Sequence, residues 1–425
     1  MSKNYISIWI NIMTRVISVS IESWSEFSIK DICINISSGG TPSRKVPEYY
    51  LNGVHKWIKT QELKDCNIYD TDEHITDAAL KNSSAKIYPK NTISMAMYGA
   101  TVGKLGIMKS ECATNQACCN MVVDSTKADY RFLFYSLLYR REELIGLASG
   151  AAQQNLNVGV ISNFRINLPT LSEQKAIAAT LSVLDDMIEL NNQINKTLEE
   201  MAQAIFKSWF VDFEPFKDGE FEESELGLIP KGWRVAALDE IADYLNGLAM
   251  QKYPPSKNER GLPVLKIKEL RQGFTDGNSD ICSESIDNSY IINDGDIIFS
   301  WSGSLLVDIW CGGRCGLNQH LFKVTSASYN KWFYYMWTRY HLERFIAIAK
   351  DKATTMGHIQ RKHLSEAKVL IPEPNTLAFM DSVMQPIIDL VIANKVENKT
   401  LSTIRDTLLP KLMSGEIRVP VEEVV

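Results

Sequence analysis

The sequence predicts an α+β protein with two homologous mixed domains and two long helices that pack as an antiparallel coiled coil, related by a pseudo-two-fold internal repeat. Two observations predict this fold class. The string Asn195–Leu198 returns as Asn398–Leu401, and other residues recur at a similar spacing of about 200 residues, which is far too long for a solenoid repeat. Each copy also places short strand-like runs ahead of a long helical run with heptad spacing.

Composition allows a soluble globular chain with two or three cores, since 425 residues carry 45% apolar and 23% charged side chains. The net charge of −6 argues against a protein that coats DNA nonspecifically, but it leaves room for a local basic face. Eight irregularly spaced cysteines predict reduced thiols in a cytosolic protein. Cys311, Cys315 and His320 lack a second close pair of ligands, so we predict no metal site.

The first domain is expected at residues 23–170, after an N-terminal extension of residues 1–22 that alternates apolar and polar side chains. The extension lacks the uninterrupted apolar run of a membrane span and is not followed by a signal cleavage pattern. Inside the domain we predict strands at residues 54–59, 92–97 and 120–123 and a helix at residues 130–147.

A long helix is expected over residues 171–210, which contain no proline or glycine, with Ser172 as its N-cap. Its seam residues advance in alternating steps of four and three, the pattern of a coiled coil. The second copy repeats the seam over residues 373–413, although Pro386 is expected to delay or kink its first turns. Both seams carry asparagine at the same two core positions: Asn191 and Asn195, Asn394 and Asn398.

Buried asparagines at seam positions lower stability but fix register and partner. We therefore expect the two helices to pack against each other, antiparallel, with the asparagine pairs near the middle; the competing interpretation is a helix face that happens to be polar. The linker between the copies is expected at residues 211–232, the second domain at residues 233–372 and a C-terminal tail at residues 414–425.

Four long strings resemble the specificity subunit of Type I restriction–modification enzymes. Residues 168–175 and 206–215 are similar to the start and end of that family's first conserved helix, residues 229–233 to the start of its second target-recognition domain, and residues 408–419 to its C-terminal signature. The resemblance covers nearly everything after about residue 22. One departure is that the second helix begins without the Glu-Gln pair of the first copy.

The resemblance implies a cytoplasmic, non-catalytic subunit that recognises double-stranded DNA and has no membrane partner. Each globular domain would be a target-recognition domain that reads one half of a bipartite site. The helices would act as a ruler and as the docking surface for two modification subunits, and motor-nuclease restriction subunits would join the same complex. No cofactor is expected in this chain; S-adenosylmethionine, and ATP with magnesium for restriction, would be bound by the partner subunits.

Two rival functions stay open at this point, and the residues bear on both. A self-contained methyltransferase or nuclease is disfavoured because Tyr253–Ser256 lacks the Asn/Asp head and aromatic end of an adenine methyltransferase loop. Gly99–Leu105 has the wrong glycine spacing for a phosphate-binding loop and no hydroxyl for magnesium. The other rival is a coiled-coil assembly scaffold that contacts DNA without sequence preference.

Base reading requires paired donors and acceptors on loops that enter the major groove. Three places in each copy carry such side chains at matching positions but with different residue types, as expected for two different half-sites. The candidates in the first copy are Lys59 and Gln61, then Tyr98 and Thr101, then Gln153, Gln154 and Asn155. Those in the second copy are Lys266 and Lys268, then Trp301 and Ser302, then Thr354, Thr355 and His358. The competing interpretation is that they are ordinary polar loops.

Phosphate contacts are expected from basic loops near these readers, namely Arg44, Lys45, Lys352, Arg361 and Lys362. Asn115-Gln116 and Asn318-Gln319 are identical between the copies, which favours a structural turn over sequence reading. Helices of about 35 residues span roughly 50 Å, more than one DNA turn of about 34–36 Å. The sequence therefore predicts two short half-sites separated by an unread spacer.

Overall fold

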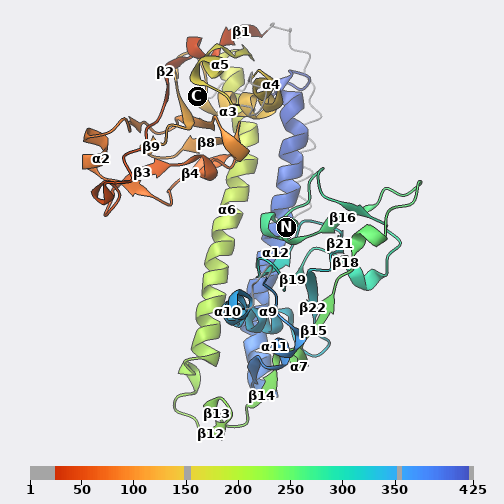
Figure 1. Cartoon of the computed structure of the whole chain (residues 1–425). Helices are drawn as coiled ribbons and strands as arrows, with labels where there is room; N and C mark the ends of the chain where they lie inside the picture. The colour runs from red at the N-terminus through yellow and green to blue at the C-terminus, as the bar shows by residue number, and fades with distance from the viewer. Residues whose placement is uncertain (1–23, 148–154, 352–356, 421–425) are drawn as a thin grey trace. The chain divides into compact units, whose positions relative to one another are not determined.

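The computed structural model describes residues 24–147, 155–351 and 357–420, which form two compact units. The first unit comprises the described residues up to Asp186 together with those from Ser402 onward. The second unit runs from Met187 to Leu401. Figure 1 shows the order of the elements along the chain. The two long helices, α6 (Leu171–Phe210) and α12 (Pro374–Met413), each contribute one end to each unit.

The first unit contains a five-stranded sheet, a four-stranded sheet and a two-stranded pair. The five-stranded sheet is ordered β2 (Cys33–Ser38), β10 (Cys118–Val123), β7 (Ile93–Ala96), β8 (Leu105–Met108) and β4 (Cys66–Ile68). The four-stranded sheet is ordered β5 (His74–Ile75), β3 (His55–Ile58), β9 (Cys112–Thr114) and β6 (Ile87–Tyr88), and β1 (Ser25–Ser28) pairs with β11 (Arg165–Leu168). The helices are α2 (Asp77–Lys81), α3 (Tyr130–Tyr139), α4 (Arg141–Gly146) and α5 (Val158–Asn163).

The second unit repeats this strand order and lacks only a counterpart of β4 among its described residues. One sheet is ordered β15 (Asp243–Asn246), β22 (Leu321–Thr325), β19 (Asp296–Ser300) and β20 (Leu306–Trp310). The other is ordered β17 (Ile281–Cys282), β16 (Leu262–Leu265), β21 (Cys315–Leu317) and β18 (Ile291–Ile292), and β14 (Arg234–Ala237) pairs with β23 (Lys368–Ile371). The helices are α7 (Leu238–Ile241), α8 (Ile267–Gln272), α9 (Lys331–Tyr340), α10 (Leu342–Asp351) and α11 (Arg361–Ser365), and the hairpin of β12 (Phe221–Ser224) and β13 (Gly227–Pro230) precedes them.

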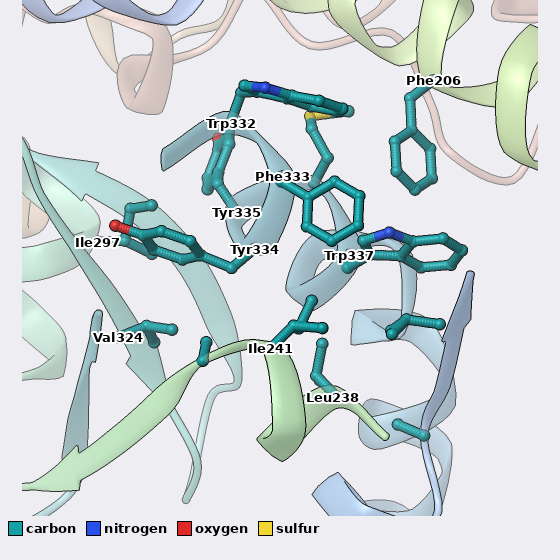
Figure 2. Close-up of a cluster of buried hydrophobic side chains, with 14 of the residues drawn as sticks. Phe206, Leu238, Ile241, Ile297, Val324, Trp332, Phe333, Tyr334, Tyr335 and Trp337 are labelled. Carbon is teal, nitrogen blue, oxygen red and sulfur yellow. The ribbon is translucent and has the colours of Figure 1, made fainter. Parts of the chain in front are cut away.

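The core of the second unit is built on α9, whose aromatic side chains pack between the sheet and the long helices (Figure 2). Trp332 and Phe333 are fully buried and lie in one cluster with Phe206 of α6 and Ile297 of β19. The Trp332 indole also donates a hydrogen bond to Asp381 of α12. Large aromatic faces each remove much apolar area from water, so this helix fixes the domain to both long helices.

The first unit uses the same device on α3, with Phe132 and Tyr135 buried. The Tyr135 hydroxyl donates to Asp185 of α6 at 2.6 Å, and Arg405 of α12 donates to the same carboxylate at 2.6 Å. Burial and the neighbouring Asp185 carboxylate raise the pKa of Tyr135 far above its usual range. The phenol therefore keeps its proton at neutral pH and donates it to Asp185.

Within the second unit, α6 and α12 run antiparallel and meet through buried amides. Asn394 donates to the Asn195 side-chain oxygen at 2.9 Å, and Asn195 donates to the Val391 carbonyl at 3.3 Å. Asn191 donates to Asn398 at 2.9 Å. The residue number rises along α6 as it falls along α12, which is the antiparallel sense.

Three details of the helices differ from the sequence prediction. Helix α6 begins at Leu171, and its N-cap is Thr170, whose hydroxyl accepts a hydrogen bond from the Glu173 backbone amide at 3.3 Å. The prediction of Ser172 as the N-cap is wrong, because Ser172 already lies inside the helix. Helix α12 runs through Pro386 without interruption. The carbonyl that proline leaves without its helical partner belongs to Ser382, an exposed residue to which water has access.

The third difference is that the helix expected over residues 130–147 is divided at Arg140 into α3 and α4. Arg140 leaves the helical conformation with φ −99° and ψ 20°. Its guanidinium donates to the Arg165 carbonyl and to Glu143, contacts that hold the break in place.

The amide pair gives a stability prediction. Asn195→Ala leaves the Asn394 amide, which is 8% exposed, without its acceptor, and we expect a loss of about 1–3 kcal/mol in unfolding free energy. Replacing both residues by leucine should restore or exceed the original stability, because an apolar pair needs no hydrogen bond. Urea unfolding followed by circular dichroism checks this, with the exposed amide variant Gln203→Ala as control. Equal losses in the single and double variants would contradict the account.

Candidate nucleic-acid interface

In the first unit, backbone hydrogen bonds bring the predicted reading loops to one edge of the sheets. The Asn115 amide donates to Ile58 at 2.9 Å, next to the loop that follows β3. The Met97 amide donates to Ala117 at 2.8 Å, and the Leu156 amide donates to Met97 at 2.9 Å. We call the resulting surface the first loop edge; it comprises Lys59–Glu62, Tyr98–Thr101, Asn115–Ala117 and Asn155–Asn157.

The second unit forms the same edge with the same bonds. The Asn318 amide donates to Leu265 at 3.2 Å, the Trp301 amide to His320 at 3.4 Å, and the Ile359 amide to Trp301 at 3.1 Å. The second loop edge comprises Lys266–Glu269, Trp301–Ser304, Asn318–His320 and Gly357–Gln360. Each edge is therefore held by main-chain contacts, which leaves the side chains free to differ between the copies.

A glycine directly after β2 in the first copy, and after β15 in the second, lets the chain cross this edge. A Cβ on Gly39 would lie 2.2 Å from the Thr114 carbonyl oxygen, and a Cβ on Gly247 would lie 2.2 Å from the Asn318 carbonyl oxygen. No side chain is accommodated at either distance, because the opposing atoms are backbone. The crossing segment in the first unit is fixed further by the Trp57 indole, which donates to the Gly40 carbonyl at 3.1 Å.

Two candidate cations of the first unit, Lys59 of the first loop edge and Arg44 outside it, are held by one acidic side chain. Arg44 and Lys59 both pair with Glu73, at 2.5 Å and 2.7 Å. The two hydrogen bonds, Arg44 first, hold the pKa of Glu73 down at about 2. The Arg44 guanidinium also lies over the Tyr50 ring, 4.2 Å from its centroid. Both cations are thus positioned before any ligand binds, and part of their charge is already neutralised.

The lysines of the second loop edge also lie beside carboxylates: Lys266 pairs with Asp280, and Lys268 lies 3.5 Å from Asp276. The remaining basic candidates, Lys45, Arg361 and Lys362, are exposed. Within the described ranges none of these three forms an ion pair with a carboxylate, although Arg361 donates to the Tyr244 carbonyl at 3.2 Å. In the part of the chain that the structure describes, the charge of these three cations is therefore not offset by a carboxylate partner.

The polar candidates fall into an exposed group and an internally bonded group. Gln61, Tyr98, Asn155 and His358 are exposed, and Thr101 is half-buried. Ser302 is only 4% exposed, and its hydroxyl lies 3.0 Å from Nδ1 of His320. The Trp301 indole donates to the Asn246 side chain at 2.8 Å. Gln153, Gln154, Lys352, Thr354 and Thr355 lie outside the described residues.

Sequence analysis did not identify three residues that hold the candidate DNA-binding side chains in place. Glu73 holds two cations from a position far along the chain, and no spacing pattern signals it. Asn246 and His320 support Trp301 and Ser302 in the second unit. His320 could have been found, because it directly follows the repeated Asn318-Gln319 and aligns with Ala117 in the first copy.

The repeated asparagines form the same turn in both units. The Asn115 side-chain oxygen accepts from the Ala117 amide at 3.1 Å, and the Asn318 side-chain oxygen accepts from the His320 amide at 3.2 Å. This is the local hydrogen bond that an asparagine uses to close a turn. The asparagines therefore have a structural role, whereas the glutamines that follow them take no part in the turn's bonds.

Two further features bear on the class of protein. No group of three or more histidine, cysteine, aspartate or glutamate side chains that could hold a metal ion occurs in the part of the chain that the structure describes. Among the same residues, α12 is the single helix whose length and composition would allow it to cross a membrane. Met380, Met384 and Ile388 of this helix pack in the core of the second unit.

Comparison with known proteins identifies the family. The sequence profile described as "Type I restriction modification DNA specificity domain" matches residues 21–200 and 230–404, which is most of the chain. The chain belongs to this family. It is a DNA-recognition subunit, and in type I systems the specificity subunit is non-catalytic and the catalytic activities belong to partner subunits.

The relatives match along nearly the whole chain. The type I restriction enzyme MjaIX specificity subunit of Methanocaldococcus jannaschii is 32% identical over 415 residues, covering 94% of each chain. The MjaVIII specificity subunit of the same organism is 24% identical over 424 residues, again with 94% of each chain covered. The crystal structure of the type I S subunit from M. genitalium is 18% identical with a TM-score of 0.56, over 93% of this chain and 98% of that one, and it supports the fold.

The ion pairs of Glu73 predict an acid-sensitive contribution to stability. Because the folded-state pKa is about 2 and the ordinary value is 4.5, the contribution is present above about pH 4.5 and is lost as the pH falls towards 2. Glu73→Gln should lower the melting temperature at neutral pH. The melting temperature of this variant should then decrease less than that of the parent as the pH is lowered. Melting measured by circular dichroism from neutral to acidic pH checks this, with exposed Glu48→Gln as control. The account fails if the two variants and the parent lose stability in parallel.

Proposed function

We propose that each loop edge reads one half of a bipartite site in double-stranded DNA. The observation that carries the proposal is that the same backbone bonds build both edges while the side chains on them differ: Tyr98 against Ser302, and Ala117 against His320. A scaffold with no reading task has no need to vary these positions within a constant frame. Two different half-sites require that variation.

The contacts divide by exposure and by partner. Gln61, Tyr98, Thr101 and Asn155 in the first copy, and His358 in the second, are proposed to face base edges, together with Gln153, Gln154, Thr354 and Thr355. Lys268 is proposed to do so as well, from its place beside Asp276. Lys59, Lys266, Trp301 and Ser302 have partners within their own unit and would act at the same face while held in place. Arg44, Lys45, Lys352, Arg361 and Lys362 are proposed to bind phosphates.

The long helices are proposed to set the gap between the half-sites. Each has 40 residues and spans about 60 Å at 1.5 Å per residue, against about 34–36 Å for one turn of DNA. Each is continuous across the boundary between the two units, so its length is fixed by its own hydrogen bonds. We take residues 23–170 and 233–372 as the recognition domains and residues 171–210 and 373–413 as the ruler.

One face of α6 is proposed to dock a modification subunit. Met187, Leu190, Ile194 and Met201 follow heptad steps and are 37–55% exposed. A row of large apolar side chains exposed on a helix is typical of a surface that binds a second amphipathic helix. The corresponding positions on α12 are Leu390, Ala393, Glu397 and Ile404, a less apolar set.

The repeat supports a complex with two modification subunits, joined by restriction subunits, in the cytoplasm. S-adenosylmethionine, and ATP with magnesium, are proposed to bind to those partners. All eight cysteines lie in the described ranges and none of them is in a disulfide, which suits a reducing compartment.

The function is tested by selection from randomised duplex DNA with the chain co-expressed with its modification subunit. We expect a bipartite motif with a fixed gap. Inserting seven residues into both helices adds about 10.5 Å and should lengthen only the gap, by about three base pairs. Retention of DNA without a motif would favour the scaffold function, and altered half-sites in the insertion variant would contradict the ruler.

The docking face is tested by capture of the modification subunit. Leu190→Lys with Ile194→Lys places two charges in the apolar row, and we expect at least a tenfold loss of affinity. Gln193→Lys with Gln203→Lys adds the same charge at exposed positions outside the row and should bind as the parent does. Isothermal titration of the purified subunits measures both. Equal affinity of the two double variants would remove this face from the interface.

A further inference from the structure

The identical glutamines of the two loop edges, Gln116 and Gln319, differ in what surrounds them. Each follows the asparagine that closes the turn, and the turn's own hydrogen bonds use only the asparagine side chain and the backbone. Each turn also lies between two proposed reading loops, because its backbone bonds to Ile58 or Leu265 on one side and to Met97 or Trp301 on the other. The glutamines are therefore at the proposed DNA-facing edge without a structural task in the turn.

In the first copy, the Gln116 side chain is held through its oxygen. The Thr41 hydroxyl donates a hydrogen bond to Oε1 of Gln116, and Gln116 is exposed. The oxygen is thus engaged as an acceptor by the protein. Within the described residues the amide nitrogen, with its two hydrogens, has no hydrogen-bond partner and remains for a ligand.

In the second copy, the Gln319 side chain is held through its nitrogen. Nε2 of Gln319 lies 3.3 Å from Nε2 of His320, and Nδ1 of His320 lies 3.0 Å from the buried Ser302 hydroxyl. If the ring nitrogen Nε2 accepts from the glutamine, a neutral imidazole carries its proton on Nδ1 and donates to Ser302. Within the described residues, Oε1 of Gln319 has no hydrogen-bond partner, so the group that remains is an acceptor.

We propose that Gln116 and Gln319 are specificity-determining residues that present opposite hydrogen-bonding groups to DNA. Gln116 offers its amide N–H to a base acceptor in the major groove, such as guanine N7 or O6 or thymine O4. Gln319 offers its carbonyl oxygen to a base amino group, that of adenine or cytosine. The inference rests on the proposed function, in that it assumes that the loop edges face the major groove.

This inference changes how the repeated Asn-Gln pair is understood. Identity between the copies favours a shared structural role, and for Asn115 and Asn318 that role is visible in the turn. For the glutamines, the polarity of the side chain is set by its neighbours: Thr41 in one copy, and His320 with Ser302 in the other. The same residue type therefore reads different bases.

The test is the same substitution at both positions, Gln116→Glu and Gln319→Glu, in the chain complexed with its modification subunit. A carboxylate has acceptors only. In Gln319→Glu the imidazole proton of His320 moves to Nε2 and donates to one carboxylate oxygen, while the Ser302 hydroxyl donates to Nδ1. The other carboxylate oxygen still accepts from the base amino group. In Gln116→Glu the donor is lost, and the exposed oxygen faces a base acceptor.

Selection from randomised duplex DNA should therefore give different results for the two variants. Gln319→Glu should keep the parental base at every position. Gln116→Glu should lose its preference at one base pair of one half-site by about tenfold and shift towards adenine or cytosine there. Gln193→Glu, at an exposed position on α6, controls for the added charge, and melting temperatures control for folding.

Several outcomes overturn the inference while the proposed function stands. One is a parental motif in both variants; another is a loss of preference in both. A shift at Gln319→Glu alone would reverse the polarity and also overturn it. If the parent itself selects no bipartite motif, the proposed function fails first, and that result is distinct from the other three.

Discussion

Buried amide contacts between α6 and α12 set the arrangement on which the second unit depends. Asn195 and Asn394 pair in the seam, as Asn191 and Asn398 do, and sliding one helix along the other would leave these amides without partners. The register they fix decides which residues the helices offer to the recognition domain. Asp381 meets the Trp332 indole, and Phe206 packs against Trp337 at a ring distance of 4.9 Å. Apolar contacts alone would tolerate a slipped helix, whereas these polar partners do not.

In both loop edges, backbone hydrogen bonds hold the loops in place, and the side chains on those loops differ between the copies. Both loop edges rest on equivalent backbone hydrogen bonds and on a glycine that allows a close crossing, so side chains vary without moving the frame. The charged side chains are likewise held by partners within the unit. Arg44 and Lys59 share Glu73, which limits their attraction to any phosphate backbone and suits a chain with a net charge of −6. In the proposed interface such an edge would gain affinity chiefly from a matching sequence, which is what a specificity subunit requires.

Local features such as helix bounds could be predicted from the sequence, whereas contacts between residues far apart in the chain could not. The bounds of α6 follow from a stretch free of proline and glycine with a regular seam, and the repeat predicts a second helix. The expectation that Pro386 would delay the second helix is wrong, because Met384 and Ile388 on either side of it pack in the core, which sequence does not show. Likewise, Ser302 looks like a surface serine until its burial beside His320 is known, and Glu73 becomes the partner of two cations only through folding. Loop positions were predictable from the repeat, but side-chain partners were not.

The central claim is that one edge of each recognition domain faces the DNA. Hydrogen exchange measured by mass spectrometry, on the complex with its modification subunit, with and without cognate duplex, tests it most directly. The account predicts that DNA slows exchange at backbone amides of both loop edges, above all over residues 98–101 and 301–304, with little change over residues 187–201 of α6. Protection confined to the long helices, with both loop edges exchanging as they do without DNA, would contradict it.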